Sequence, residues 1–105
     1  MTLPEQQTEI VVARHPVGLP EPADFAERVL PVPMPADGEL LLRVHWLSID
    51  PWLRPLLGGR HLVPPPPVGT RVPGQVVGEV LVSRDAHHGV GDWVVADCGW
   101  CEYAT

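Results

Sequence analysis

The chain has 105 residues, the length of one small domain, and this excludes a nucleotide-binding domain beside a catalytic one. Thirteen acidic against seven basic residues give a net charge of -6, which argues against nucleic-acid binding because such binding depends on clustered positive charge. Fourteen prolines and ten glycines exclude long helices, since a proline inside a helix removes a hydrogen bond and clashes with the preceding turn.

The N-terminus lacks the basic and apolar segments of a signal peptide, and no apolar run is long enough to cross a membrane. Two cysteines do not make the disulfide framework of a small secreted domain. We therefore expect a cytoplasmic protein without a membrane partner.

The first half of the chain predicts two strands. A polar N-terminus at residues 1–8, expected to be frayed, precedes a strand at residues 9–14, which are rich in β-branched side chains. Residues 23–30 contain helix formers but run into alternate prolines, which favour an extended edge segment, so helix and strand both remain open there. After a turn at Asp37-Gly38, residues 40–47 form the strongest strand of this half.

Alternate residues of the strand at 40–47 form one uniformly apolar face, which we expect to meet the core. They are Leu40, Leu42, Val44 and Trp46.

A short helix is predicted after this strand. Asp50 has the side chain of an N-cap and Pro51 suits the first helical position. Pro55 and the pair Gly58-Gly59 must keep the helix short. The four prolines at 64–67 then predict an extended surface loop.

Three further strands are expected in the second half, at residues 74–84, 92–97 and 100–105. Gly78, in the middle of the first of these, indicates a bulge or a close approach of two backbones. Five or six short strands with proline and glycine turns indicate a small barrel or sandwich. The four tryptophans are too many for so small a core, so some should line a surface or cleft.

Cys98 and Cys101 have the C-x-x-C spacing of half a metal site or of a redox motif. A metal would need further ligands, and His87-His88 point to opposite faces of a strand, which suits one metal poorly. A redox pair normally begins a helix, which is not expected here. Structural cysteines are the favoured interpretation, with metal and redox roles left open.

Ser48 and Asp50, with His45 or His61, supply the residue types of a catalytic triad. Nothing in their spacing brings them together, and we interpret Ser48 and Asp50 as turn and capping residues. No catalytic residue is therefore assigned.

Five segments in chain order resemble signature motifs of one enzyme family. Residues 46–54 (WLSIDPWLR) resemble the motif LSxDPYMR, and residues 74–80 (GQVVGEV) resemble GxxVGEV. The other three segments are residues 12–20, 90–95 and 99–104. The family is the zinc-independent branch of the medium-chain dehydrogenase/reductase superfamily, which contains the alkenal and prostaglandin double-bond reductases.

The resemblance implies a mainly β fold, a GroES-like, partly open β-barrel with one short helix, over residues 9–105. In the family this domain precedes a Rossmann domain that binds NADPH, which is absent from these 105 residues, so the domain is expected to be truncated and not to bind NADPH alone. The family reaction transfers a hydride to the β-carbon of an α,β-unsaturated carbonyl, and no metal is implied.

The resemblance also implies where the substrate cleft lies. Trp52 and Arg54 would border it, and Ser48 and Asp50 would shape its loop. Trp52 stands where the family has a tyrosine, and Arg54 is expected to pair with an acid rather than to face cofactor phosphates. No cofactor-binding residue is assigned.

We therefore expect the N-terminal substrate-side domain of an NADPH-dependent enone or alkenal double-bond reductase, inactive as an isolated chain. Whether this chain by itself counts as an enzyme stays open. The alternative is a stand-alone β-domain that binds an apolar ligand or a protein partner, and an unpaired last strand at Thr105 would suit a homodimer. A zinc-dependent alcohol dehydrogenase fragment survives only if Cys98 and Cys101 bind metal.

Overall fold

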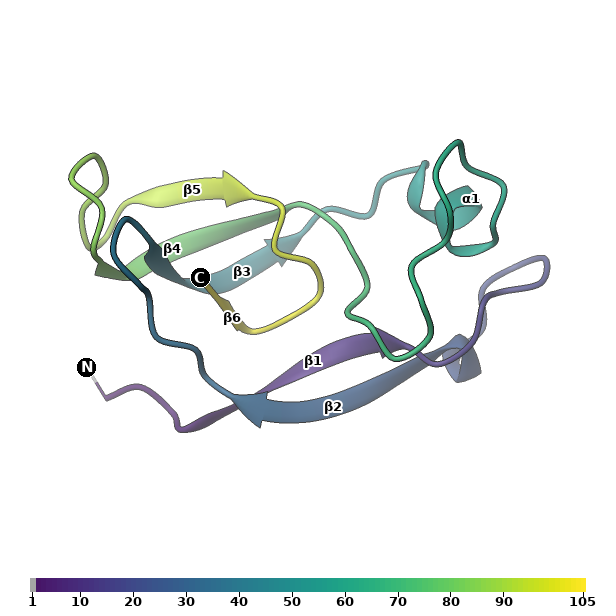
Figure 1. The fold of residues 1–105 in the computed structure, drawn as a ribbon, viewed down its shortest axis with the longest axis horizontal. Helices are drawn as coiled ribbons and strands as arrows, with labels where there is room; N and C mark the ends of the chain where they lie inside the picture. The colour runs from purple at the N-terminus through teal and green to yellow at the C-terminus, as the bar shows by residue number, and fades with distance from the viewer. Residues whose placement is uncertain (1) are drawn as a thin grey trace.

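The computed structural model describes residues 2–105, which contain six strands, a 3-10 turn and one five-residue helix. The expected mainly β class with one short helix is confirmed. Figure 1 shows two antiparallel sheets with the helix at one end of the elongated molecule. One sheet pairs β1 (Gln6–Val12) with β2 (Phe25–Pro31), and the other has the order β5 (Trp93–Ala96), β4 (Val76–Ser83), β3 (Leu40–Leu47), β6 (Tyr103–Ala104).

The edge of β1 that does not pair with β2 connects the two sheets. Isolated bridges join Glu9 to Cys101 and Val11 to Arg71. The N–H of Ile10 donates to the carbonyl of Trp100 at 2.9 Å. Because these contacts are single bridges and not a continuous ladder, the barrel closes only in part.

β1 begins earlier than expected, at Gln6. The N-terminus is therefore not frayed as far as residue 8, although Met1 lies outside the described residues. The physical reason is that the buried side chain of Gln7 hydrogen-bonds to the backbone of β6, and the N–H of Thr8 donates to a Glu102 carboxylate oxygen at 2.6 Å. These partners lie at the opposite end of the sequence, where strand patterns cannot indicate them.

The segment left open between helix and strand contains both kinds of structure. A 3-10 turn covers Pro22–Asp24, and β2 follows directly. The turn is fixed by Asp24, whose carboxylate accepts hydrogen bonds from the N–H of Glu21 at 2.7 Å and from Nε of Arg14 at 2.6 Å.

β3 has the expected bounds, but its predicted face is wrong at Trp46, which is 70% exposed. His45 has no partner in β4, because Val44 pairs with Gly78 and Trp46 with Val77. This extra residue turns Trp46 to the outer face. At the start of the strand both faces are covered, since the consecutive residues Leu41 and Leu42 are both buried.

The close approach expected at Gly78 is confirmed. A Cβ atom on this residue would lie 3.1 Å from Cβ of Leu42 and 3.2 Å from the carbonyl oxygen of Arg43. The strands expected around residues 74–84, 92–97 and 100–105 are present as the shorter β4, β5 and β6.

The helix α1 (Leu53–Leu57) begins two residues later than expected. Asp50 is not its N-cap, because Trp52 takes that position without a capping side chain. Pro55 lies in the first turn, where its missing N–H costs nothing, and the helix ends at the predicted Gly58-Gly59 pair.

The helix packs its apolar side on the core. Leu53 and Leu57 are buried against Val12 of β1 and Val72, with Ile10, Phe25 and Trp100 packed around them. Among residues 2–105 no helix is long and apolar enough to span a membrane.

Candidate functional site

An apolar depression of about 400 Å³ lies beside the start of α1. Trp52, Leu56, Val72 and Pro73 belong to its lining. Arg71 and the turn at residues 97–99 line it as well. We call this hollow the Trp52 depression; its size and apolar lining suit a flat organic ligand.

Trp52 is the predicted site residue that lines this depression. Its side chain is 38% exposed, and its ring meets the ring of His61 edge-on with centroids 6.5 Å apart. The indole N–H is a hydrogen-bond donor, which can serve a carbonyl oxygen of a ligand.

Ser48 and Asp50 lie together, outside the lining of the Trp52 depression. The Ser48 hydroxyl donates to Oδ1 of Asp50 at 2.8 Å, and the carbonyl of Asp50 accepts the N–H of Leu53 at 3.1 Å. Ser48 lines a depression of about 230 Å³ with Trp46 and Gln75. The pair therefore shapes the loop before α1, as a turn rather than as a cap.

Arg54 lies on the exposed side of α1, away from the lining of the Trp52 depression. None of the ion pairs formed among residues 2–105 includes it, so the expected pairing with an acid is wrong. The structure thus joins Ser48 to Asp50, and no ion pair among residues 2–105 joins Arg54 to Asp50.

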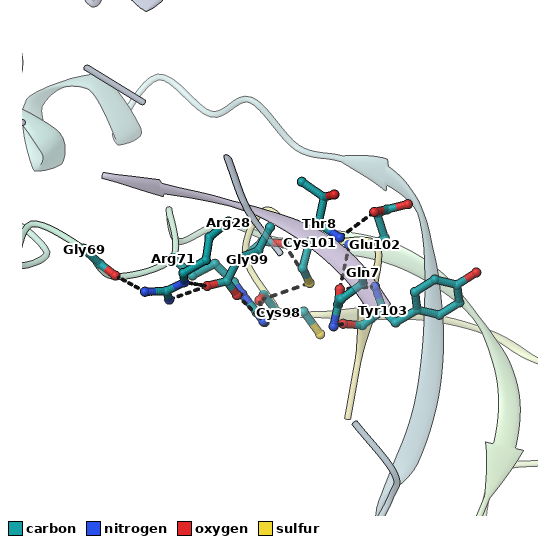
Figure 2. A network of polar contacts seen from close by, with 11 residues as sticks. Gln7, Thr8, Arg28, Gly69, Arg71, Cys98, Gly99, Cys101, Glu102 and Tyr103 are labelled. Carbon is teal, nitrogen blue, oxygen red and sulfur yellow. Dashed lines mark hydrogen bonds and ion pairs between the residues drawn. The ribbon is translucent and has the colours of Figure 1, made fainter. Parts of the chain in front are cut away.

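The buried carboxylate of Glu9 binds Arg71, which lines the Trp52 depression; Figure 2 shows Arg71 and Arg28 within this polar network. Glu9 is 2% exposed and accepts hydrogen bonds from Nε and Nη2 of Arg71 at 2.9 and 2.7 Å. Arg28 binds the second carboxylate oxygen of Glu9 and donates to the carbonyl of Gly69 at 2.8 Å. Burial alone raises the pKa of Glu9, but the two guanidinium groups outweigh it and lower that pKa below its usual value.

Arg71 also holds the turn at residues 97–99. Its Nη1 donates to the carbonyl of Cys98 at 3.1 Å. Gly99 has φ +79°, and a Cβ atom on it would lie only 2.7 Å from the carbonyl oxygen of Val72. The turn can therefore pass close over Val72 only because glycine occupies this position.

The two cysteines are free thiols in this turn, Cys98 half-buried and Cys101 buried. Burial raises the pKa of Cys98, and burial raises that of Cys101 to about 11. Both thiols therefore stay protonated near neutral pH. No group of three potential metal-ligating side chains gathers within residues 2–105.

The tryptophans divide between surface and core as expected. Trp46 and Trp93 are exposed on the second sheet, whereas Trp100 stacks on Phe25 with ring centroids 5.5 Å apart. The indole N–H of Trp100 is buried without a partner among residues 2–105.

Sequence reasoning missed Glu9, Arg28, Arg71 and Gln7. The first four residues of β1, Gln6 to Glu9, are all polar, so the sequence pattern does not single out Gln7 and Glu9 as the buried ones. The arginine that pairs with Glu9 lies 62 residues further along the chain, where local sequence does not indicate it.

The chain belongs to the family of N-terminal oxidoreductase domains, which residues 8–105 match. This confirms the resemblance to the N-terminal domains of medium-chain dehydrogenase/reductase enzymes, and with it the GroES-like, partly open β-barrel.

The relatives are longer proteins. The chain is 34% identical over 94 residues to the NADPH-dependent curcumin reductase of Escherichia coli. The aligned region covers 89% of this chain and 27% of that protein. It is 32% identical over 91 residues to prostaglandin reductase 1 of Sus scrofa, covering 87% of this chain and 26% of the relative. The chain thus spans little more than a quarter of either relative.

A solved structure gives the same result for the fold. CurA from Vibrio vulnificus superimposes with a TM-score of 0.86 at 37% identity, over 93% of this chain and 29% of CurA. Its complex with NADPH gives a TM-score of 0.84.

Proposed function

We propose that this chain is the substrate-side N-terminal domain of an NADPH-dependent reductase that acts on the C=C bond of an enone or alkenal. The observation that carries the proposal is the similarity to a curcumin reductase over 89% of the chain, which includes the Trp52 motif beside an apolar depression. The prostaglandin reductase of Sus scrofa supports the same substrate class.

The residues of this chain fit the substrate and do not fit the dinucleotide. The Trp52 depression is lined mainly by apolar side chains and contains a single guanidinium, that of Arg71. The phosphates of a dinucleotide would need a glycine-rich turn at a helix N-terminus or several basic groups. In this proposal another part of the complete protein holds NADPH, and the isolated chain reduces nothing.

The chain's own contribution is to hold the enone and polarise it. Negative charge develops on the carbonyl oxygen when the double bond is reduced, so a fixed donor near that oxygen lowers the barrier. Trp52 lines the depression, and its indole N–H can serve as such a donor. Ser48 and Asp50 keep the loop before α1 in place through their mutual hydrogen bond.

The remaining parts of the proposal concern the location in the cell and the independence of zinc. We propose a cytoplasmic enzyme that acts on small molecules without zinc. Leu47 and Gln75 stand at positions where the zinc-dependent branch of the superfamily has a cysteine and a histidine, and neither side chain is a zinc ligand.

A protein-contact role is a second candidate, favoured by the exposed Trp46, Trp93 and Val95 on β3 and β5. If a homodimer forms through this surface, the fraction of dimer would rise with protein concentration. Light scattering across a concentration series tests it, and a constant monomer mass would exclude it.

The experiment that tests the main proposal uses the polypeptide isolated from its native source. NADPH and benzalacetone are expected to give NADP⁺ and benzylacetone, while acetophenone, which has no C=C bond next to its carbonyl, is expected to be left unchanged. Reduction of acetophenone to its alcohol without reduction of benzalacetone would overturn the proposal. The 105-residue chain serves as the inactive control.

A further inference from the structure

Arg71 has hydrogen-bond donors to spare on the wall of the Trp52 depression. A guanidinium carries five N–H groups. Three of them are used inside the protein, two by Glu9 and one by the carbonyl of Cys98. One N–H on each Nη remains, and Arg71, whose side chain is 29% exposed overall, is one of the lining residues of the depression.

The two arginines of the cluster share one carboxylate, that of Glu9. Asp97, an exposed acid, lines the same depression and makes no hydrogen bond to Arg71 among the described residues. Because Asp97 balances the charge of the cluster, a ligand carboxylate would be held by direct hydrogen bonds to the Arg71 guanidinium and not by a net positive charge.

The guanidinium is also held in a fixed orientation. Glu9 binds it through two atoms and the Cys98 carbonyl through a third, so little side-chain freedom is lost when a ligand binds. The planar fork matches the two oxygens of a carboxylate, which a lysine could not do in the same way.

We propose that Arg71 determines ligand specificity in the Trp52 depression by binding a carboxylate, while the apolar part of the same ligand lies against Trp52. Combined with the proposed function, on which this last step rests, the substrate class is an enone that carries a carboxylate group. Recognition of the carboxylate itself does not depend on the reduction.

The test measures binding of trans-cinnamate and of methyl cinnamate to the 105-residue chain, followed by the NMR signal of the Trp52 indole. The two probes share their apolar part and differ in charge. The acid is expected to bind about tenfold more tightly than the ester, as for a hydrogen-bonded charge pair, and high salt should reduce this preference. Equal affinity of the wild-type chain for acid and ester, or no binding of either, would overturn the proposal.

Arg28 provides a matched control. It binds the same Glu9 carboxylate but does not line the depression. Arg71→Met is expected to abolish the preference for the acid, whereas Arg28→Met should retain it. Equal loss in both variants would show that Arg71 acts only through the stability of the cluster, and the specificity role would be wrong.

Two further variants keep the test decisive if Arg71→Met does not fold, which circular dichroism will show. Arg71→Lys keeps the charge without the fork and should lose most of the preference. Asp97→Asn removes the acid from the wall and should strengthen acid binding by about twofold to threefold, the size of a screened surface interaction; unchanged preference in both variants would overturn the proposal. Failure of the native polypeptide to reduce both benzalacetone and an enone that carries a carboxylate would refute the proposed function and leave this binding result standing.

Discussion

Gln7 and Tyr103 lie 96 positions apart in the sequence and are joined by two hydrogen bonds through one side-chain amide. The Gln7 amide nitrogen donates to the carbonyl of Tyr103 at 2.9 Å, and its oxygen accepts the N–H of the same residue at 2.9 Å. The side chain thus completes the backbone pairing of β6, a strand of only two residues, Tyr103–Ala104.

Replacing Gln7 with alanine leaves a buried N–H and a buried carbonyl of Tyr103 without partners. We expect Gln7→Ala to lower the free energy of unfolding by about 2 kcal/mol. Gln6→Ala, at an exposed position in the same strand, should change it by less than about 0.5 kcal/mol. Urea unfolding measures both, and equal effects would show that the amide does not hold β6.

Glu9→Gln should destabilise the chain by about 2–3 kcal/mol at neutral pH, because two arginines lose the buried carboxylate that they share. Glu27→Gln, which changes an exposed glutamate of β2, is the matched control and should have little effect. Urea unfolding midpoints of the two variants give the comparison.

The same carboxylate makes stability depend on pH. The pKa of Glu9 is lowered in the folded state, so its contribution is complete above the ordinary glutamate pKa of about 4.3 and is lost as the pH falls through the lowered value. The wild-type chain should therefore lose more stability than Glu9→Gln between about pH 5 and the acid limit of unfolding. Parallel pH curves for the two proteins would contradict this.

Cys101 should react with iodoacetamide much more slowly than Cys98. Burial raises the pKa of the Cys101 thiol to about 11, so almost no thiolate forms at mildly alkaline pH, and the thiol is covered by the protein. Mass spectrometry of Cys98→Ser and Cys101→Ser follows each thiol alone. Equal rates in the folded variants would show that the turn opens faster than the reagent reacts.

Trp52→Ala should lower kcat/KM for benzalacetone in the native polypeptide by about tenfold or more, because both the apolar wall and an N–H donor are lost. Trp52→Phe keeps the ring without the N–H and separates the two effects. Trp46→Ala, an exposed tryptophan outside the Trp52 depression, is the control and should keep its activity. An unchanged Trp52→Ala would remove Trp52 from the substrate cleft.

The family motifs and the pattern of apolar residues in the strands predicted most of the fold. β3 was predictable to the residue because Leu40–Leu47 is continuous and rich in large apolar side chains. Trp46 was misplaced because a bulge depends on the partner strand, and the alternation within one strand does not show it.

The candidate site was predictable only on the side that lies within one motif. Trp52 belongs to the segment 46–54, which can be recognised from sequence alone. Arg71, which also lines the depression, is held by Glu9. This pairing spans 62 residues, so no local sequence pattern indicates it. Arg54 was expected to pair with an acid from its charge alone, but no carboxylate among residues 2–105 pairs with it.

The unpaired residue His45 has a consequence for how this domain can vary. It lies between Val44 and Trp46 and shifts the side chains that follow it by one position relative to β4. Deleting this single residue would exchange the inner and outer faces at the end of β3 and turn Trp46 inward without altering any other part of the sequence. The number of residues at this point of β3 is therefore as constrained as their type. We expect insertions and deletions in the surface loops instead.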